Sequence, residues 1–140
     1  MDILYKTTAV STGGRDGKVV VEDSTLEFDM ALPTEIGGTK KSGSNPEQLF
    51  AAAYSACFGS ALQHVVRSQK LHIATPKVQA TVGIGKSDVG GFALTVDIVA
   101  TISGVAQDLA DVLVKEAHNV CPYSNATRGN IEVNVIAKIK

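Results

Sequence analysis

The sequence lacks any concentration of basic charge. Its 13 lysine and arginine residues and 14 aspartate and glutamate residues are spread along 140 positions and leave a formal net charge of -1. Proteins that bind nucleic acid neutralise its phosphates with clustered lysine and arginine side chains. We therefore expect no nucleic acid among the partners of this protein.

The sequence also has little that resembles a targeting or membrane-spanning segment. Its start, Met1 to Lys6, lacks the basic and then apolar regions of a signal peptide. The longest weakly polar run, residues 49–62, is rich in alanine and serine and is shorter than the about 20 residues that cross a bilayer. The sequence predicts a cytoplasmic protein without a membrane partner.

Cysteine is scarce, and its arrangement argues against structural metal. The two cysteines, Cys57 and Cys121, form no Cys-x-x-Cys motif, and the three histidines are scattered along the chain. Structural zinc needs four suitably spaced cysteine and histidine ligands, so we expect no metal site. A permanent structural disulfide is disfavoured in the cytosol, whereas a transient catalytic disulfide is compatible with that compartment.

The first third of the chain has the patterns of short strands. Residues 2–11 and 17–31 are rich in strand-forming residues, and the second segment is interrupted by Asp23 and Ser24. Several glycines between the two segments permit a turn with positive φ. A loop rich in glycine, lysine and serine is expected over residues 33–44.

A helix start follows this loop. Asn45 suits the N-cap, Pro46 suits the first helical position, and Gln48 can reach back to the cap as in a capping box. The pattern predicts a helix that continues to about Gln69. Because this helix is apolar on nearly every side, we expect it to be buried.

The second half of the chain adds a helix and more strands. Apolar and polar residues alternate, as in strands with one buried face, in residues 78–84, 92–102 and 131–139. A second helix is predicted from near Gln107 to Cys121, where Pro122 disfavours helix in the preceding residue. The order β-β-β-α-β-β-α-β predicts an α+β fold with two main helices packed on a sheet, in one domain that covers residues 1–140.

Cys57 is not reactive by its position alone. A buried helical cysteine is usually a small apolar side chain, and Cys57 lies about three turns from the helix start, where the helix dipole helps little. His64, on the same face, is about 10 Å away along the helix, which is beyond hydrogen-bond reach. A reactive Cys57 therefore needs a positive charge from outside its helix.

Arg15 and Glu47 are the chemical candidates for that charge. Arg15 projects from a glycine-flanked turn and stays charged even when partly buried. Glu47, in the first turn of the Cys57 helix, can act as its counter-charge. Most turn arginines and first-turn glutamates are solvated, and the spacing leaves open whether Arg15 and Glu47 meet Cys57 or whether Cys121 does.

Three motifs stand out in the sequence: Gly-Gly-Arg-Asp-Gly at residues 13–17, Asn-Pro-Glu-Gln-Leu-Phe-Ala-Ala at 45–52 continuing to Ala-Cys-Phe at 56–58, and Cys-Pro-Tyr-Ser-Asn-Ala-Thr-Arg-Gly-Asn at 121–130. Together they resemble the motifs of one protein family, the organic hydroperoxide resistance proteins. They occur in the family's order, and the similarity covers essentially the whole chain. The last motif resembles this branch of the OsmC/Ohr family more closely than the osmotically inducible protein C branch. Ala53 and Ser55 replace the glycine and alanine of a typical member, and both remain small.

The resemblance implies an OsmC/Ohr-like fold, an intertwined homodimer with two active sites at the subunit interface, and roles for four residues. Cys57 is then the peroxidatic cysteine, Cys121 the resolving cysteine, and Arg15 with Glu47 the activating pair. The implied enzyme is a cysteine-based, peroxiredoxin-like peroxidase that protects against oxidative stress. It reduces organic hydroperoxides to alcohols through a Cys57 sulfenic acid and a Cys57–Cys121 disulfide. The expected reductant is a dihydrolipoyl group on a lipoylated protein or another dithiol, and no metal, flavin or haem is needed.

An apolar pocket and two other functions also follow from these residues. Five apolar side chains can line a site for an organic peroxide, although apolar side chains mostly serve core packing: Leu26, Phe28, Phe50, Phe58 and Tyr123. A non-catalytic stress protein that binds an apolar ligand is an alternative to the peroxidase. A general disulfide oxidoreductase is disfavoured because the Cys-x-x-Cys motif is missing.

Overall fold

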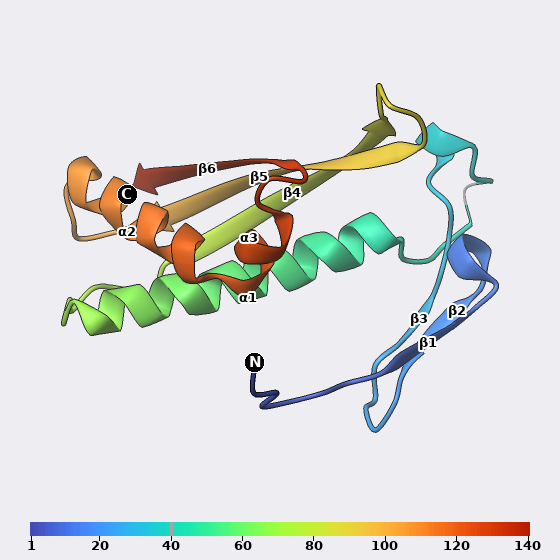
Figure 1. Cartoon of the computed structure of the whole chain (residues 1–140), viewed down its shortest axis with the longest axis horizontal. Helices are drawn as coiled ribbons and strands as arrows, with labels where there is room; N and C mark the ends of the chain where they lie inside the picture. Colours follow the sequence, from blue (N-terminus) through green and yellow to red (C-terminus); the bar gives the residue numbers. More distant parts are fainter. Residues whose placement is uncertain (40) are drawn as a thin grey trace. The chain divides into compact units, whose positions relative to one another are not determined.

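The chain is described by a computed structural model that covers residues 1–39 and 41–140. Figure 1 shows its elements, coloured along the sequence. The described residues form two units, Met1–Leu49 and Phe50–Lys140. The long helix α1, Pro46–Ser68, crosses the boundary between them, and each unit has its own sheet.

The sheet of the first unit is antiparallel in the order β1-β2-β3. Its strands are β1 Ala9–Thr12, β2 Lys18–Val21 and β3 Glu27–Asp29. A short 3-10 turn, η1 Gly14–Asp16, connects β1 to β2. The predicted break at Asp23 is confirmed, since this residue has a φ of 54° in the turn between β2 and β3.

The prediction of a strand over residues 2–11 is wrong in its first part. β1 begins only at Ala9, and the residues before it are exposed and lie outside the strand. A strand needs a partner with free N–H and C=O groups, and β2 pairs with β1 only over Lys18–Val21. Within the predicted loop at residues 33–44, the structure has a 3-10 turn, η2 Thr34–Ile36, and position 40 lies outside the described residues.

The sheet of the second unit has the order β4-β5-β6. Its strands are β4 Lys77–Lys86, β5 Phe92–Ile102 and β6 Glu132–Ile139. β4 and β5 form an antiparallel hairpin, whereas β5 and β6 are parallel. A parallel pair needs a crossover connection, which the helices between β5 and β6 provide.

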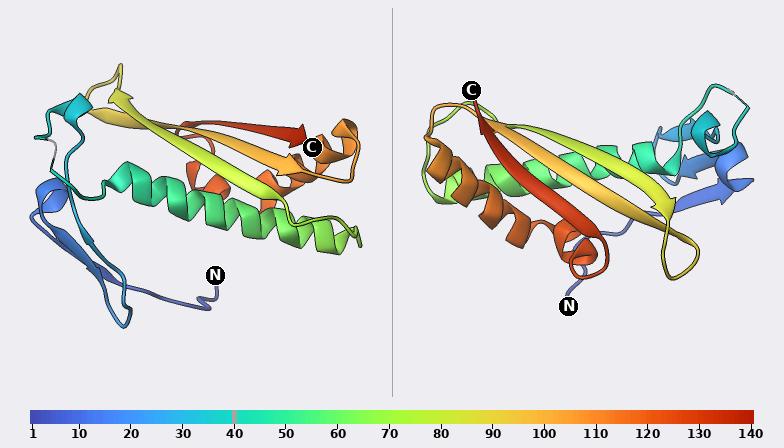
Figure 2. Two further views of the ribbon diagram at one scale, coloured as in Figure 1. Left: turned by 180° about the vertical axis from the view of Figure 1, so that it is seen from behind. Right: turned by 90° about the horizontal axis from the view of Figure 1, so that it is seen from above.

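The helices α1 and α2, Gln107–Val120, cover one face of this sheet (Figures 1 and 2). Alternate β5 side chains are almost completely buried beneath them: Val96, Ile98, Ala100 and Ile102. Phe58 of α1 and Leu113 of α2 are fully buried in the same core. Burying a large apolar side chain contributes about 1.5–3 kcal/mol, so this face holds the second unit together. The predicted α+β fold with two main helices on a sheet is confirmed.

The helix ends follow the local sequence signals. Asn45 Oδ1 accepts a hydrogen bond of 2.8 Å from the Gln48 amide, and the Gln48 side chain accepts one of 3.1 Å from the Asn45 amide. This is the predicted capping box. A six-residue helix, α3 Pro122–Thr127, follows α2 and was not predicted from the sequence. Pro122 ends α2 because it disfavours helix at Cys121, and it also suits the first position of a new helix.

Helix α1 is longer than the apolar run at residues 49–62. It has 23 residues and, within the described part of the chain, is long and apolar enough to cross a bilayer by length and composition alone. A core helix passes the same test. Tyr54, Phe58 and Leu62 are fully buried in the core that α1 shares with the sheet and α2, so packing explains the apolar side chains on this face. The expectation that the whole helix is buried is wrong, because Ala52 and Ala56 on another face are exposed.

Candidate active site

The second unit brings the two cysteines together. Cys57 lies on α1 and is partly exposed, whereas Cys121 is fully buried between α2 and α3. Their sulfur atoms are 3.7 Å apart, with the Cys121 thiol donating toward Cys57. A disulfide bond is about 2.05 Å long, so the two thiols are free but need only a small movement to bond. The separation of 64 residues along the chain did not predict whether the two cysteines lie close together.

Cys121 owes its place to the bend between α2 and α3. Its backbone has an extended conformation, with φ of -66° and ψ of 122°, and it serves as the C-cap of α2 and the N-cap of α3. Pro122 produces this bend because a proline disfavours the helical conformation of the residue before it. The bend places the Cys121 side chain in the core beside α1 instead of continuing α2.

The surroundings of Cys57 favour the thiol over the thiolate. Burial raises the pKa of Cys57 above its ordinary value, a hydrogen bond from the backbone of Tyr123 acts in the opposite direction, and the neighbouring Cys121 raises the pKa further. His64 and His72 are exposed, as predicted for histidines without a catalytic role. Among the described residues, no cation contributes to the pKa of Cys57, so a nucleophilic Cys57 requires one.

The first unit brings Arg15 and Glu47 together. Arg15 Nη1 donates to Glu47 Oε2 at 2.8 Å, and Nη2 donates to Oε1 at 2.6 Å. This two-pronged pairing holds both groups in a defined plane. The hydrogen bond from Arg15 holds the pKa of Glu47 below its usual value, and the carboxylate raises the pKa of Arg15 in return. The predicted pair is thus present as charged guanidinium and carboxylate.

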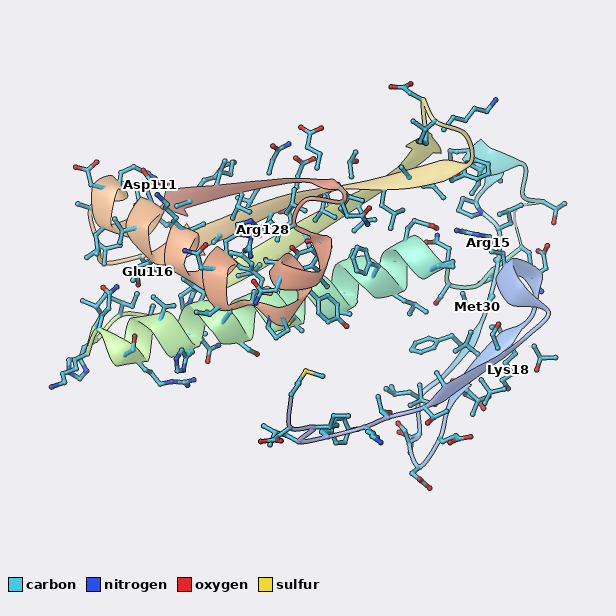
Figure 3. All side chains as sticks on the ribbon, viewed as in Figure 1. Arg15, Lys18, Met30, Asp111, Glu116 and Arg128 are labelled. Carbon is cyan, nitrogen blue, oxygen red and sulfur yellow. The ribbon has the colours of Figure 1, made fainter. Side chains whose placement is uncertain are left out.

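Glycines in the turn before β2 allow Arg15 to occupy its position (Figure 3). Gly13 and Gly14 have positive φ values of 78° and 55°, which cost other residues free energy. A Cβ on Gly17 would lie 1.7 Å from the carbonyl oxygen of Thr12. The glycines of the first motif are therefore required by the backbone that presents Arg15.

We expect Glu47→Gln to weaken the acid dependence of folding stability. Because the folded pKa of Glu47 is lower than its ordinary value of 4.5, the pairing stabilises the fold fully above that pH. This stabilisation is lost as pH falls through the lower folded pKa. The side chains of Arg15 and Glu47 are 35% and 12% exposed, so water partly screens the pair. We therefore expect Glu47→Gln to lower the free energy of unfolding by only about 1 kcal/mol near neutral pH.

Urea unfolding as a function of pH measures this effect. Glu22→Gln is the matched control, because Glu22 is exposed on the same unit. We expect Glu22→Gln to keep the acid dependence of the wild type. A Glu47→Gln variant whose stability falls with acid as steeply as that of the wild type would show that the pairing does not stabilise the fold.

The predicted pocket residues divide between the two units. Phe50 and Tyr123 stack with ring centroids 6.0 Å apart, and Phe58 is completely buried in the core. In the first unit, Phe28 is half-buried and Leu26 is 53% exposed. Their joint role in binding a peroxide stays a prediction.

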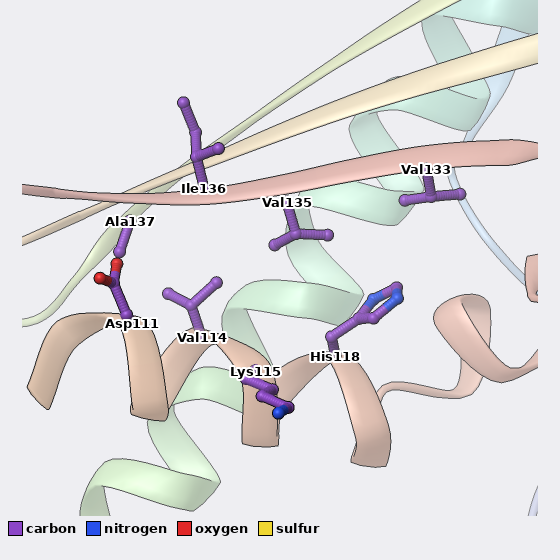
Figure 4. Close-up of a pocket in the computed structure, with 8 residues that line it drawn as sticks. All are labelled: Asp111, Val114, Lys115, His118, Val133, Val135, Ile136 and Ala137. Atoms are coloured by element: carbon purple, nitrogen blue, oxygen red, sulfur yellow. The ribbon is translucent and has the colours of Figure 1, made fainter. Parts of the chain in front are cut away.

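A groove of about 550 Å³ lies between α2 and β6 (Figure 4). It is lined by residues that were not predicted to form a pocket, among them His118, Val133 and Val135.

Among the described residues, no cluster of three histidine, cysteine, aspartate or glutamate side chains is placed to hold a metal ion.

Three buried polar side chains near the cysteines were not predicted from the sequence. Tyr54 and Ser124 are fully buried, and Thr127 is 7% exposed. Each has a hydrogen-bond partner inside the second unit. The sequence feature that could have predicted this set is the spacing of Ser124 and Thr127. Residues three apart place their two hydroxyl groups on one side of a short helix.

Comparison with known proteins identifies the family. The model of the family "OsmC-like protein" matches residues 38–136. The organic hydroperoxide resistance protein-like 2 of Staphylococcus epidermidis is 47% identical over 133 residues, which cover 94% of each chain.

Solved structures agree with this match. The crystal structure of an organic hydroperoxide resistance protein from Elizabethkingia anophelis is 48% identical, covers 100% of both chains and superposes with a TM-score of 0.95. A putative organic hydroperoxide resistance protein from Vibrio cholerae, solved with captopril bound in one of its active sites, is 47% identical over 98% of this chain and 94% of that chain, with a TM-score of 0.91. This chain therefore belongs to the OsmC family and, within it, to the organic hydroperoxide resistance proteins.

Proposed function

We propose that this protein is a thiol-dependent peroxidase that reduces organic hydroperoxides to alcohols and so protects against oxidative stress. The family supports a role in resistance to organic hydroperoxides. The observation that carries the chemical mechanism is the 3.7 Å separation between the sulfur atoms of Cys57 and Cys121. Two free thiols at this distance suit a cycle in which a disulfide forms and is reduced again.

In the first step the Cys57 thiolate attacks one oxygen of the hydroperoxide. A sulfur–oxygen bond forms, the oxygen–oxygen bond breaks, and the alkoxide leaves and takes up a proton to become the alcohol. The sulfur is oxidised to a sulfenic acid by two electrons, and the hydroperoxide is reduced by the same two electrons. Cys57 suits this role better than Cys121 because Cys57 is partly exposed and Cys121 is fully buried.

Arg15 supplies the charge that Cys57 lacks. Because burial raises the pKa of Cys57, a nearby cation is needed to favour the thiolate near neutral pH. Glu47 holds the guanidinium through two of its nitrogens and leaves the remaining N–H groups for a thiolate or a peroxide oxygen. In this proposal Arg15 activates Cys57 in the reaction with hydroperoxide.

In the second step Cys121 attacks the sulfenic acid, and a disulfide and water form. A dithiol, such as the dihydrolipoyl group of a lipoylated protein, then reduces the disulfide and becomes oxidised in its place.

The proposed protein is a cytoplasmic, intertwined homodimer in which residues 1–140 form one domain. The Vibrio cholerae relative holds captopril in one of its active sites, which supports the proposal of more than one active site in the dimer.

Mass spectrometry after treatment with one equivalent of cumene hydroperoxide tests the proposed function. We expect a loss of about 2 Da that links the peptides of Cys57 and Cys121, followed by steady peroxide consumption once dihydrolipoamide is added. A non-catalytic protein that binds an apolar ligand would instead keep both thiols free and be stabilised by the ligand. That result would contradict the peroxidase.

A further inference from the structure

A buried hydrogen-bond network connects the helices that carry the two cysteines. The Tyr54 hydroxyl on α1 lies 3.0 Å from Ser124 Oγ and 3.2 Å from Thr127 Oγ1, both on α3. Ser124 Oγ also lies 2.9 Å from Nδ1 of His118 on α2. These four side chains are called the hydroxyl network below. It joins α1, α2 and α3; Tyr54, Ser124 and Thr127 are buried, and His118 is partly exposed.

The hydroxyl network is closely linked to the two cysteines along the chain. Tyr54 precedes Cys57 by one turn of α1, His118 precedes Cys121 by one turn of α2, and Ser124 follows Cys121 by three residues. Side chains three residues apart in a helix lie on neighbouring positions of its surface. A hydrogen bond between these positions therefore controls the separation of the two backbones that hold the sulfur atoms.

Helix α3 depends on such contacts for its orientation. It has six residues, and an isolated helix of that length is unstable in water. Besides the hydroxyl network, Arg128 donates to the His118 carbonyl oxygen and to Asn125 Oδ1, each at 2.8 Å (Figure 3). The bend at Cys121 is thus tied to α1 by Tyr54 and to α2 by His118.

We propose that the hydroxyl network positions Cys121 for the resolving step, so that the Cys57 sulfenic acid is captured before a second hydroperoxide oxidises it. This inference rests on the proposed peroxidase function. In the capture step a sulfur–sulfur bond forms between Cys121 and Cys57 and the sulfur–oxygen bond of the sulfenic acid breaks. The hydroxyl group leaves as water with the Cys121 thiol proton. The competing reaction yields a sulfinic acid, which a dithiol does not reduce.

The geometry favours a role in capture over a role in the first oxidation. The sulfur atoms must approach from 3.7 Å to about 2.05 Å, a movement that side chains can make if the helices keep their separation. A thiol held this close acts at a high effective concentration. Among the described residues, the hydrogen bonds of the hydroxyl network go to one another and to backbone oxygens of α3, and none goes to the Cys57 sulfur.

The test compares two rates in the full-length protein under single-turnover conditions. Tyr54→Phe removes one buried hydroxyl group and keeps the ring. Ser124→Ala removes the central hydroxyl group of the network and is measured as a second variant, so that the test stands if one of the two does not fold. Tyr5→Phe is the matched control, because Tyr5 is 80% exposed. The readouts are the rate of cumene hydroperoxide consumption, the rate of disulfide formation, and the fraction of Cys57 found as sulfinic acid at increasing hydroperoxide.

We expect Tyr54→Phe to slow disulfide formation about five-fold, the effect of one lost hydrogen bond. The hydroperoxide concentration that gives half sulfinic acid should fall by the same factor, while the consumption rate stays close to that of the wild type. His118→Asn, which keeps a polar group near the position of Nδ1, should restore more of the disulfide rate than His118→Ala. Thermal unfolding of each variant checks that the fold is retained.

Three outcomes overturn the inference, and they differ from one another. If the wild type forms no disulfide, the proposed function fails and the inference fails with it. If the wild type forms the disulfide but Tyr54→Phe and Ser124→Ala keep its rate and its sulfinic fraction, the inference alone fails. If both variants slow peroxide consumption as much as disulfide formation, the hydroxyl network supports the site generally and does not position Cys121.

Discussion

Replacing Cys57 with serine is expected to abolish the reduction of organic hydroperoxides, with a loss of roughly a thousandfold or more. Serine is close in size to cysteine, and Cys57 is only partly buried, so the core should be retained. A serine hydroxyl stays protonated near neutral pH and cannot form a sulfenic acid. The measurement is the consumption of cumene hydroperoxide in the presence of dihydrolipoamide.

Cys121→Ser is the matched control for this prediction. Cys121 is fully buried, and its thiol donates toward Cys57, so the first oxidation at Cys57 should survive its loss. We expect this variant to consume one equivalent of hydroperoxide to form the Cys57 sulfenic acid and a second equivalent where that sulfenic acid is oxidised to sulfinic acid, without an internal disulfide. Sustained turnover by Cys57→Ser would remove Cys57 from the mechanism.

Arg15→Ala is expected to produce the second-largest effect. Burial raises the pKa of Cys57, and in the proposed mechanism Arg15 opposes this by stabilising the thiolate. Loss of an opposite charge beside a thiol lowers the thiolate fraction near neutral pH by on the order of a hundredfold. The reaction of Cys57 with hydroperoxide should slow by a similar factor, and its pH profile should move to higher pH. Stopped-flow rates across a range of pH measure both changes.

Two further variants show whether charge or geometry is responsible. Arg15→Lys keeps the positive charge but cannot form the two-pronged pair with Glu47, so we expect an intermediate rate. Arg67→Ala, at the exposed end of α1, should react like the wild type. An Arg15→Ala protein with an unchanged pH profile would exclude Arg15 from the activation of Cys57.

Local signals were sufficient for much of the fold. The start of α1 follows from Asn45 and Gln48, because the side chain of each residue accepts a hydrogen bond from the backbone amide of the other. The alternation in β5 correctly predicted its buried face, because successive side chains of a strand point to opposite sides. The end of α2 follows from Pro122. Each of these features depends on residues that are neighbours in the chain.

The failures concern interactions with residues distant in the chain. β1 is shorter than predicted because its length depends on its partner β2, which its own sequence does not specify. Helix α3 was not predicted, because so short a helix depends on contacts such as those between Tyr54, Ser124 and Thr127. Those contacts join residues about 70 positions apart in the chain, and the pattern of residues within one helix does not predict them.

The sequence by itself determined the order of the strands and the two main helices, the capped helix that carries Cys57, the glycine turn that carries Arg15, and the family. Only the tertiary structure decided that the Arg15 guanidinium pairs with Glu47 and that the Cys121 sulfur lies 3.7 Å from that of Cys57. The physical reason is that patterns along a chain specify which face of an element is buried. The distance between two side chains on different elements depends instead on how those buried faces pack together.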